Sequence, residues 1–322
     1  MGFLVVATDP LHTDFSGELE ELAAIGAEFR VARCRTEEEV ADACRDADGV
    51  LVTFAPVGRR ALAGMARCRI IVRTGVGYDT LDVAAATERK VMVANVPDYC
   101  ISEVADHALA LLLCLWRRIG ELDAQFRAQG WTTPVRPVRR LEGRVLGIIG
   151  LGRIGRAVAA RARGFGLRIL ACDPYVPADV FSVLGVESVG LEGLLRSADI
   201  VTLHTPLTHE TQGLIRKDTL RQMKPTALLL NTSRGGVVVI EDLVEALRQG
   251  WIAGAGLDVF KDEPLPRDHA IRTLPHVLLT PHAAWYSEES ERELRRRAAR
   301  TAVQALRGER PPTLLNPEVF DR

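Results

Sequence analysis

The amino-acid sequence predicts a doubly wound α/β protein with two parallel-sheet domains, one of them inserted into the other. Short apolar runs alternate along the 322 residues with segments of helical composition, which implies parallel strands joined by crossover helices. A glycine-rich turn follows an apolar run at residue 150, so a second α/β domain begins in mid-chain. A last helical segment, residues 288–307, has few partners unless it returns to the first domain. We therefore predict a discontinuous domain of residues 1–97 and 290–322, and an inserted domain of residues 98–289.

Composition and charge exclude several classes of protein. Hydrophobic residues make up 47% of the chain and charged residues 26%, as in ordinary globular domains. With 41 Lys and Arg against 42 Asp and Glu, the chain lacks the basic excess of a nucleic-acid-binding protein. The longest apolar stretch, Ala108–Trp116, is too short to span a bilayer, and the N-terminus has no basic region or signal-peptide cleavage site. We therefore expect a cytoplasmic protein without membrane or nucleic-acid partners.

The cysteines give no sign of a metal site or a disulfide framework. There are six, scattered at Cys34, Cys44, Cys68, Cys100, Cys114 and Cys172. No pair has CxxC spacing, and none lies near a histidine in a metal-ligand pattern. We expect reduced, mostly buried side chains and no bound metal.

The first domain is predicted from five apolar runs with helical segments between them. Continuous apolar runs of this length are typical of strands buried on both faces of a parallel sheet. The predicted strands are Leu4–Thr8, Phe29–Ala32, Val50–Phe54, Ile70–Arg73 and Val91–Ala94. The helical segments include Leu19–Ile25, Glu37–Cys44 and Leu81–Glu88.

Two segments follow Pro97, where the first domain ends. The first is a strongly apolar helix over Ser102–Arg118, with Ser102 as its N-cap and Glu103 and Asp106 in its first turn. The second, residues 130–144, is basic and rich in turn residues. It is either a solvated loop or an oligomerisation arm.

The inserted domain resumes the alternation, and a long helix closes the chain. The predicted strands are Val145–Ile149, Arg168–Cys172, Ile200–His204, Ala227–Asn231, Ala253–Leu257 and Val277–Thr280. The final helix, Glu288–Arg307, follows Ser287 and has acidic residues first and arginines later, which complements the helix dipole. We interpret its basic run as a solvated helix face.

The glycine-rich turn predicts a dinucleotide site. Gly150, Gly152 and Gly155 form a GxGxxG motif between an apolar strand and a helix. The first glycine permits a tight turn, the second lets a pyrophosphate approach the backbone, and the third lets helix and strand pack closely. The N-terminus of the helix offers unpaired N–H groups and a positive dipole end to phosphates.

Asp173 predicts that the dinucleotide is NAD. This carboxylate ends the second strand of the inserted domain, 18 residues after Gly155. A carboxylate in that place accepts hydrogen bonds from a ribose 2′-hydroxyl and repels a 2′-phosphate. The next residues, Pro174, Tyr175 and Val176, include no arginine that would receive such a phosphate.

Three polar motifs follow three predicted strands of the inserted domain. They are Asn231-Thr-Ser-Arg234-Gly-Gly, Leu257-Asp-Val-Phe-Lys-Asp-Glu263-Pro and Thr280-Pro-His282-Ala-Ala-Trp285. Because ligands bind beyond the carboxyl ends of strands in an open parallel sheet, all three motifs lie on the cofactor side. Hydride transfer to a keto acid needs a cation for the carboxylate and carbonyl, an acid, and a partner for that acid. Arginine, histidine and glutamate fill these needs.

The chain resembles the D-isomer-specific 2-hydroxyacid dehydrogenase family. The motifs TGVGYDTLDV, NVPDY, GLGRIG, NTSRGG, LDVFKDEP and TPHAAW carry the resemblance, and they run through almost the whole chain. GLGRIG and TPHAAWYSEE are most similar to the C-terminal-binding-protein branch. The resemblance implies a Rossmann NAD domain inserted into a discontinuous, flavodoxin-like substrate domain. It also implies a homodimer formed through the NAD domain.

The resemblance assigns roles to the polar motifs. Arg234 would bind the substrate carboxylate and polarise the keto group, for which its planar fork is suited. His282 would be the general acid in reduction and the base in oxidation. Glu263 would pair with His282 and keep it protonated near neutrality.

The resemblance also implies substrate and cofactor contacts. Val76 and Gly77 would offer backbone N–H groups to the substrate carboxylate, and Tyr99 and Trp285 would contact the substrate. Besides the glycines and Asp173, the implied cofactor-binding residues are Arg153, Ile154, His204, Thr205, Pro206, Thr211, Thr232, Ser233 and Asp258. Asp258 would bind the nicotinamide amide. His204 is equally open to a purely structural interpretation.

The chain departs from its relatives at two positions, and alternatives remain open. Val239 replaces a usual acidic residue, where we expect a packing difference. Trp285 stands where many relatives have a smaller residue, and it is either a substrate contact or a core residue. We expect no C-terminal regulatory domain and no long corepressor-like tail. The leading function is NAD-dependent oxidation of D-2-hydroxy acids or reduction of 2-keto acids. The alternatives are an NAD(H)-responsive scaffold protein and a glyoxylate or hydroxypyruvate reductase.

Overall fold

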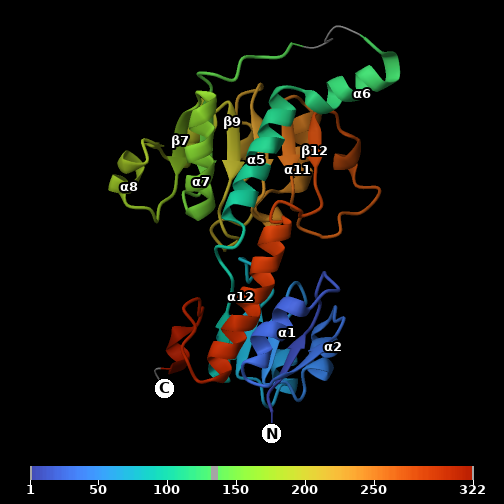
Figure 1. Cartoon of the computed structure of the whole chain (residues 1–322). Helices are drawn as coiled ribbons and strands as arrows, with labels where there is room; N and C mark the ends of the chain where they lie inside the picture. Colours follow the sequence, from blue (N-terminus) through green and yellow to red (C-terminus); the bar gives the residue numbers. More distant parts are fainter. Residues whose placement is uncertain (1, 132–136, 321–322) are drawn as a thin grey trace. The chain divides into compact units, whose positions relative to one another are not determined.

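The computed structural model describes residues 2–131 and 137–320, which divide into two compact units. Unit 1 comprises Met1–Tyr99 and Ser287–Arg322, and unit 2 comprises Cys100–Tyr286 (Figure 1). The boundaries lie at 99/100 and 286/287, where the sequence placed them at 97/98 and 289/290. Both units are parallel-sheet α/β structures, so the predicted fold class is confirmed. None of the helices in the described ranges is long and apolar enough to cross a membrane.

Unit 1 contains a five-stranded parallel sheet in the order β2-β1-β3-β4-β5. Its strands are β1 Leu4–Ala7, β2 Glu28–Val31, β3 Gly49–Val52, β4 Ile70–Arg73 and β5 Met92–Ala94. This 2-1-3-4-5 order is that of a flavodoxin-like sheet. All residues of the central strands β1, β3 and β4 are buried, whereas β2 at the edge is exposed or half-buried.

Helices cover both faces of the unit 1 sheet. One face packs against α2 Glu37–Ala43, α3 Arg59–Gly64 and α4 Val83–Glu88, with Val40, Leu62 and Ala85 in the shared core. The other face is covered by α1 Ser16–Ala23 and the C-terminal helix α12 Glu288–Leu306, which lie side by side (Figure 1). The sequence did not predict the six-residue helix α3.

Helix α12 begins after Ser287, as predicted from the sequence. Part of its basic face, however, packs against α1. Ser287 is the N-cap, and its hydroxyl accepts the Ser290 N–H at 2.9 Å. The Arg295 side chain is only 12% exposed and lies within 3.5 Å of Glu18 on α1. The interpretation as a solvated face is therefore wrong for this residue, because α1 packs against that side of α12.

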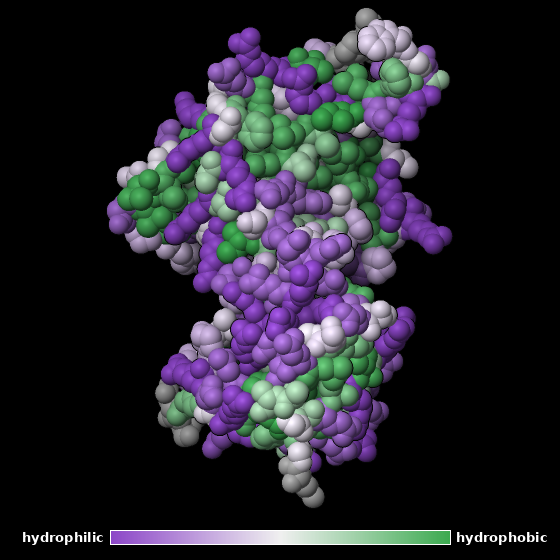
Figure 2. Space-filling view, viewed as in Figure 1, coloured by the Kyte–Doolittle hydropathy of each residue, from purple (hydrophilic) through white to green (hydrophobic). Residues whose placement is uncertain are grey.

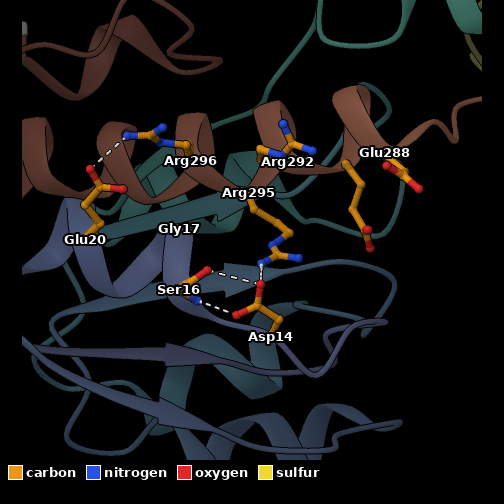
Figure 3. A pocket seen from close by; sticks show the side chains of 9 residues that line it. Asp14, Ser16, Gly17, Glu20, Glu288, Arg292, Arg295 and Arg296 are labelled. Atoms are coloured by element: carbon orange, nitrogen blue, oxygen red, sulfur yellow. Dashed lines mark hydrogen bonds and ion pairs between the residues drawn. The ribbon is translucent and has the colours of Figure 1, made fainter.

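A polar cavity of about 320 Å³ lies between α1 and α12 (Figure 3). Arginines from α12 and carboxylates from both segments line it, and several form ion pairs. Arg295 contacts Asp14 at 3.4 Å, and Arg296 contacts Glu20 at 3.1 Å. Two arginines and two carboxylates of this cavity are therefore paired with one another.

The segment after α12 completes the edge of the unit 1 sheet. Leu314 forms an antiparallel bridge with Ala94, the last residue of β5. The buried Asn316 side chain accepts the Val93 N–H at 2.8 Å and donates to the Val91 carbonyl at 2.9 Å. Residues distant in sequence therefore complete the hydrogen bonding of β5.

Unit 2 contains a seven-stranded parallel sheet in the order β12-β11-β10-β9-β6-β7-β8. The strands are β6 Val145–Ile149, β7 Arg168–Cys172, β8 Glu187–Ser188, β9 Ile200–Leu203, β10 Leu228–Asn231, β11 Gly254–Leu257 and β12 Val277–Leu279. The order reverses direction between β6 and β9, which is where doubly wound sheets bind their ligands. The sequence did not predict β8, a two-residue edge strand.

Apolar helices pack on both faces of this sheet. One face is covered by α5 Ile101–Trp116, α7 Arg153–Ala162 and α8 Ala178–Val183. The other is covered by α9 Leu191–Ser197, α10 Lys217–Leu220 and α11 Ile240–Arg248. Leu112, Ile148 and Leu230 belong to the first core, and Leu195, Val201 and Leu243 to the second.

The region around α5 differs from the sequence prediction at both ends. The carbonyl of Cys100 accepts the Val104 N–H at 3.0 Å, so the helix begins at Ile101 and Ser102 is not its N-cap. A further helix, α6 Ile119–Gln129, follows α5 and has no buried residue. The basic segment 130–144 includes residues 132–136, which lie outside the described residues, so its two interpretations stay open.

Candidate active site

The glycine-rich turn lies between β6 and α7, at the topological switch point of the unit 2 sheet. Gly150 has a φ of +93°, and a Cβ atom there would lie 2.6 Å from the His204 carbonyl oxygen. A residue with a side chain would therefore push apart the turns that follow β6 and β9. Gly152 is the N-cap of α7, and a Cβ atom there would meet no atom within 4 Å. The turn thus leaves open space at a helix N-terminus, where Arg153 and Ile154 begin the first turn.

Asp173 follows β7 directly and borders the glycine-rich turn. Its Oδ2 accepts the Leu151 N–H at 2.8 Å, and its Oδ1 accepts the Tyr175 N–H at 3.0 Å. The phenol of Tyr175 donates to the Glu210 carboxylate in the loop after β9. Two carboxylates thus lie on neighbouring loops at this edge of the sheet.

The loops after β9 and β10 carry buried hydroxyl groups that fit a bound dinucleotide. Within the part of the chain that is described, the hydroxyls of Thr205 and Thr232 are buried and have no hydrogen-bond partner. A ligand with many polar groups would supply such partners. Thr211 instead donates to the Pro206 carbonyl at 2.6 Å and shapes the loop. Together with the open space at Gly152, these hydroxyls fit the NAD predicted from the sequence.

His204 is a neutral residue of this region. Burial lowers the pKa of His204 to about 4, because water cannot stabilise the imidazolium. Its Nε2 lies 2.9 Å from the Thr202 hydroxyl. This contact within the fold favours the structural interpretation that the sequence left open.

Arg234 is positioned by a turn at the end of β10. The Asn231 side chain organises this turn by accepting from the Ser233 N–H at 3.0 Å and donating to the Arg234 carbonyl at 2.9 Å. A Cβ atom on Gly235 would lie 1.9 Å from the Phe260 carbonyl carbon. The residue after Arg234 must therefore be glycine for the loops after β10 and β11 to pack together.

Glu263 and His282 form a hydrogen-bonded pair next to this turn. His282 Nδ1 lies 2.7 Å from Glu263 Oε2, while Glu263 Oε1 accepts the Phe260 N–H at 2.8 Å. Partial burial tends to raise the pKa of the Glu263 carboxyl. The hydrogen bond and charge of His282, the Phe260 N–H and the charge of Arg234 outweigh this, so the pKa lies below its ordinary value of 4.5. The glutamate is therefore ionised at neutral pH and lies within electrostatic reach of both other residues.

Asp258, which the resemblance assigns to the nicotinamide amide, is held by hydrogen bonds within the protein. Its carboxylate is 1% exposed and accepts the N–H groups of Ala283 and Ala284, both at 2.9 Å. The side chain therefore points into the protein and toward the turn that carries His282. Sequence spacing alone cannot reveal this orientation.

The other predicted substrate residues lie in both units. In unit 2, Trp285 is half-buried, and its ring packs edge-on against Tyr286 with 5.6 Å between centroids. In unit 1, Val76 and Gly77 are half-buried, and the Val76 carbonyl accepts from Asn95 Nδ2 at 2.6 Å. Tyr99 is 8% exposed. Ser233, which was predicted to bind the cofactor, is half-buried beside Asn231 in unit 2.

Sequence reasoning missed two polar residues beside the site. Thr280 donates its hydroxyl proton to Asp258, and His107 of α5 lies 2.9 Å from the Thr280 hydroxyl. The available signal was a histidine within an otherwise apolar helix. The described residues contain no group of three or more His, Cys, Asp or Glu that would hold a metal ion.

Chemically, unit 2 brings a cation, a proton donor and an ionised carboxylate to adjacent strand ends. Arg234 suits a carboxylate or carbonyl oxygen, and the His282–Glu263 pair suits proton transfer. The glycine-rich turn and the buried hydroxyls lie on the same edge of the sheet. This combination suits a redox reaction of a small oxygen-bearing anion with a dinucleotide.

Comparisons with known proteins agree with this chemistry. The family described as D-isomer specific 2-hydroxyacid dehydrogenase, NAD binding domain, matches residues 109–284. A glyoxylate reductase of Korarchaeum cryptofilum is 43% identical over 289 residues, which cover 88% of this chain and 87% of that protein. A D-3-phosphoglycerate dehydrogenase of Methanocaldococcus jannaschii is 38% identical over 97% of this chain but 59% of its own length.

Solved structures share the fold over nearly the whole chain. The D-lactate dehydrogenase of Aquifex aeolicus, complexed with NAD and lactic acid, has a TM-score of 0.86 and 26% identity, covering 95% of this chain and 96% of its own. An enzyme from Sinorhizobium meliloti described as an NADPH-dependent glyoxylate/hydroxypyruvate reductase scores 0.87 at 30% identity, covering 98% and 97%. The comparisons support the family that the sequence resembles but not its C-terminal-binding-protein branch.

Proposed function

Because this chain belongs to the D-isomer specific 2-hydroxyacid dehydrogenase family, we propose that Arg234, Glu263 and His282 catalyse the interconversion of a small 2-keto acid and its D-2-hydroxy acid. The observation that carries this assignment is the 2.7 Å contact between His282 and an ionised Glu263 within electrostatic reach of Arg234. The protein is an NAD-dependent oxidoreductase of this family. When bound, the nicotinamide supplies or takes up the hydride.

Arg234 binds the substrate in this proposal. The planar guanidinium donates two parallel hydrogen bonds to the carboxylate, or one to the carboxylate and one to the keto oxygen. In the second mode it polarises the carbonyl and stabilises negative charge as it develops on oxygen. We also assign the backbone N–H groups of Val76 and Gly77, with Tyr99, to substrate binding, because these residues lie in the TGVGYDTLDV and NVPDY motifs that the family resemblance rests on.

His282 transfers the proton. During reduction the ring donates a proton from Nε2 to the keto oxygen, since Nδ1 is bonded to Glu263. During oxidation the neutral ring accepts the hydroxyl proton. Glu263 fixes the ring orientation and stabilises the imidazolium by its negative charge.

Contacts within unit 2 support the assignment of the cofactor residues. The pyrophosphate is assigned to the N-terminus of α7 with Arg153 and Ile154, and the adenosine ribose to Asp173. The buried hydroxyls of Thr205 and Thr232 gain partners from the cofactor. Because Asp173 and Glu210 place two carboxylates near this edge, we propose a preference for NADH over NADPH.

The substrate class is a small 2-keto acid, with glyoxylate or hydroxypyruvate as the first candidates. Relatives named glyoxylate reductase support this choice. Trp285 supports a different preference, because an indole facing the substrate would favour apolar side chains. Trp285 lies within TPHAAWYSEE, one of the two strings by which the chain resembles the C-terminal-binding-protein branch. Measuring kcat/KM with small and with large apolar keto acids distinguishes these two preferences.

We further propose that the protein is a cytoplasmic homodimer that contacts its partner through unit 2. The exposed helix α6 supports a dimer, since Ile119 is 49% and Phe126 is 56% exposed. Apolar residues also gather around α5 on the surface of unit 2 (Figure 2).

The catalytic assignment is tested with His282→Ala and Arg234→Lys. His282→Ala should lower kcat by about 10²–10⁴-fold, the usual contribution of a general acid–base, while NADH still binds. Arg234→Lys should impair both KM and kcat, because the bidentate geometry is lost. Rates are measured with glyoxylate, hydroxypyruvate and pyruvate, using NADH and NADPH. His209→Ala, an exposed histidine in the loop after β9, is the control. Normal rates in the His282 variant would overturn the assignment.

Substrate preference is tested with Trp285→Ala. Each buried CH₂ contributes roughly 0.8 kcal/mol, so two or three extra carbons against the indole would raise kcat/KM by about tenfold to a hundredfold. The comparison uses glyoxylate, pyruvate, 4-methylthio-2-oxobutyrate and phenylpyruvate. If the unmodified enzyme favours the larger acids and the variant does not, Trp285 contacts the substrate. If the unmodified enzyme favours glyoxylate, the small-substrate assignment holds and Trp285 has another role.

A further inference from the structure

The turn that carries His282 adopts a conformation that needs support from outside the turn. His282 has a φ of +53°, in the left-handed region that residues with a side chain rarely occupy. Such a conformation persists where surrounding contacts impose it. The side chain of His282 is fixed by Glu263, but that contact does not fix the backbone that presents the ring.

Asp258 supplies the support on the backbone. The carbonyl oxygen of Asp258 accepts the His282 N–H at 2.8 Å. Its carboxylate accepts the next two N–H groups, from Ala283 and Ala284, both at 2.9 Å. One buried residue therefore holds three consecutive N–H groups of the turn.

Thr280 and His107 extend this support to helix α5. The Thr280 hydroxyl donates its one proton to Asp258 Oδ1, so it must act as the acceptor toward His107. His107 Nε2, 2.9 Å away, therefore carries a proton and donates it. The same nitrogen lies 3.6 Å from Asp258 Oδ1, close enough to interact with its charge.

We propose that His107 is a positioning residue for the reaction. Through Thr280 and Asp258, it fixes the orientation of the carboxylate that holds the His282 turn. Without the donor on His107, the Thr280 hydroxyl and the Asp258 carboxylate gain rotational freedom, and the left-handed turn loses part of its constraint. The inference rests on the proposed acid–base role of His282.

The proposal predicts a specific kinetic signature. A small displacement of a proton donor reduces the rate of the chemical step, and misplacements of about 1 Å lower rates by up to roughly 10²-fold. The NADH dissociation constant should stay within about twofold, because His107 and Thr280 do not belong to the assigned cofactor site. A merely structural role would instead lower the unfolding temperature and leave kcat of the folded protein unchanged.

The experiment compares two matched pairs of variants. His107→Phe removes the donor and keeps a ring, whereas His107→Gln keeps an N–H at a similar distance from the backbone. Thr280→Val removes the hydroxyl at constant shape, whereas Thr280→Ser keeps it. The donor-free variants should lose about tenfold in kcat for keto-acid reduction, and the conservative variants should retain most of it. NADH binding by fluorescence and thermal unfolding are measured on all four.

Two further variants complete the test. One is the double variant His107→Phe/Thr280→Val, and the other is the single variant His282→Ala. Because both residues act through one chain of contacts, the double variant should lose no more than the single variants. Unchanged kcat in His107→Phe, or equal losses in His107→Phe and His107→Gln, would overturn the positioning role. Unchanged kcat in His282→Ala would overturn the proposed function itself, so the two failures are distinguishable.

Discussion

The charge of Glu263 sets the pH range in which the His282–Glu263 pair can donate a proton. The pKa of Glu263 lies below its ordinary value, so the carboxylate persists from neutral pH down through 4.5 and is lost only as pH falls through the lowered value. Glu263→Gln keeps the shape and removes the charge. The pH midpoint for reduction should then move to lower pH, because the proton-donating form of the pair loses its stabilising negative charge.

The measurement is the pre-steady-state rate of NADH oxidation between pH 5 and 10. Reduction needs the protonated ring, so its rate should fall with rising pH, whereas the rate of oxidation should rise. Asp262→Asn removes a carboxylate one residue away whose side chain is exposed, and it controls for long-range charge. An unmoved midpoint in Glu263→Gln would contradict the pairing.

The neutral His204 makes folding stability depend on pH. Its pKa of about 4 in the folded protein lies below the ~6.5 of an exposed histidine, so the unfolded chain binds a proton that the folded chain does not. The neutral His204 side chain contributes fully to folding stability above pH 6.5, and this contribution is lost as pH falls toward 4. In that window the free energy of unfolding should decrease by up to about 1.4 kcal/mol per pH unit.

Replacing His204 by Gln should flatten this dependence. Thermal unfolding between pH 4 and 7 without cofactor gives the slope for each variant. His209→Gln changes an exposed histidine five residues later and should keep the slope of the unmodified protein. Equal slopes in all three proteins would show that His204 does not carry the effect.

The sequence placed the residues of the site at strand ends, but it did not give the direction of every side chain. Residues following β10, β11 and β12 must share one edge of a parallel sheet, whatever the details of packing. Whether Asp258 faces a ligand or the His282 turn depends on contacts with residues 25 or more positions away. The partnership of His107 with Thr280 spans 173 residues and has no local signature.

At the level of elements, the strands were the most predictable parts. Buried parallel strands consist of continuous apolar runs, and β4, β6 and β7 have the bounds expected from the sequence. The elements missed are those with little apolar burial. The edge strand β8 has two exposed residues, and α6 buries none, so hydrophobic periodicity gives no signal for either.

The exposed side of α6 should mediate self-association. Trp131 follows this helix and is 94% exposed, and its ring lies 6.4 Å from that of Phe126. Large exposed aromatic side chains of this kind are typical of interface centres. We expect a dimer at micromolar concentration, and Phe126→Glu should shift it toward the monomer.

Sedimentation velocity over a range of concentrations measures this shift. Val183→Glu is the matched control, because Val183 is 86% exposed on a different helix, α8. A monomer at all concentrations in the unmodified protein would contradict the dimer. If the Phe126→Glu variant remains dimeric, this face of α6 is not the dimer interface.

For the whole molecule, the discontinuity of unit 1 has a consequence for its synthesis on the ribosome. The sheet of unit 1 is complete in sequence by Ala94, but α12 covers one of its faces, and Leu306 lies against Gly49 at the start of β3. Asn316 and Leu315 also complete the hydrogen bonding of β5. The nascent N-terminal part of unit 1, residues 1–99, therefore emerges without the helix that covers β3 and β4.

Unit 2, by contrast, is encoded by one uninterrupted stretch, Cys100–Tyr286. Unit 2 can close its own core before α12, which residues 1–99 need to complete unit 1, has been synthesised. We therefore expect the usual N-to-C order of domain folding to be inverted in this protein. We expect β3 and β4 to present apolar surface to chaperones while the nearly two hundred codons of Cys100–Tyr286 are translated.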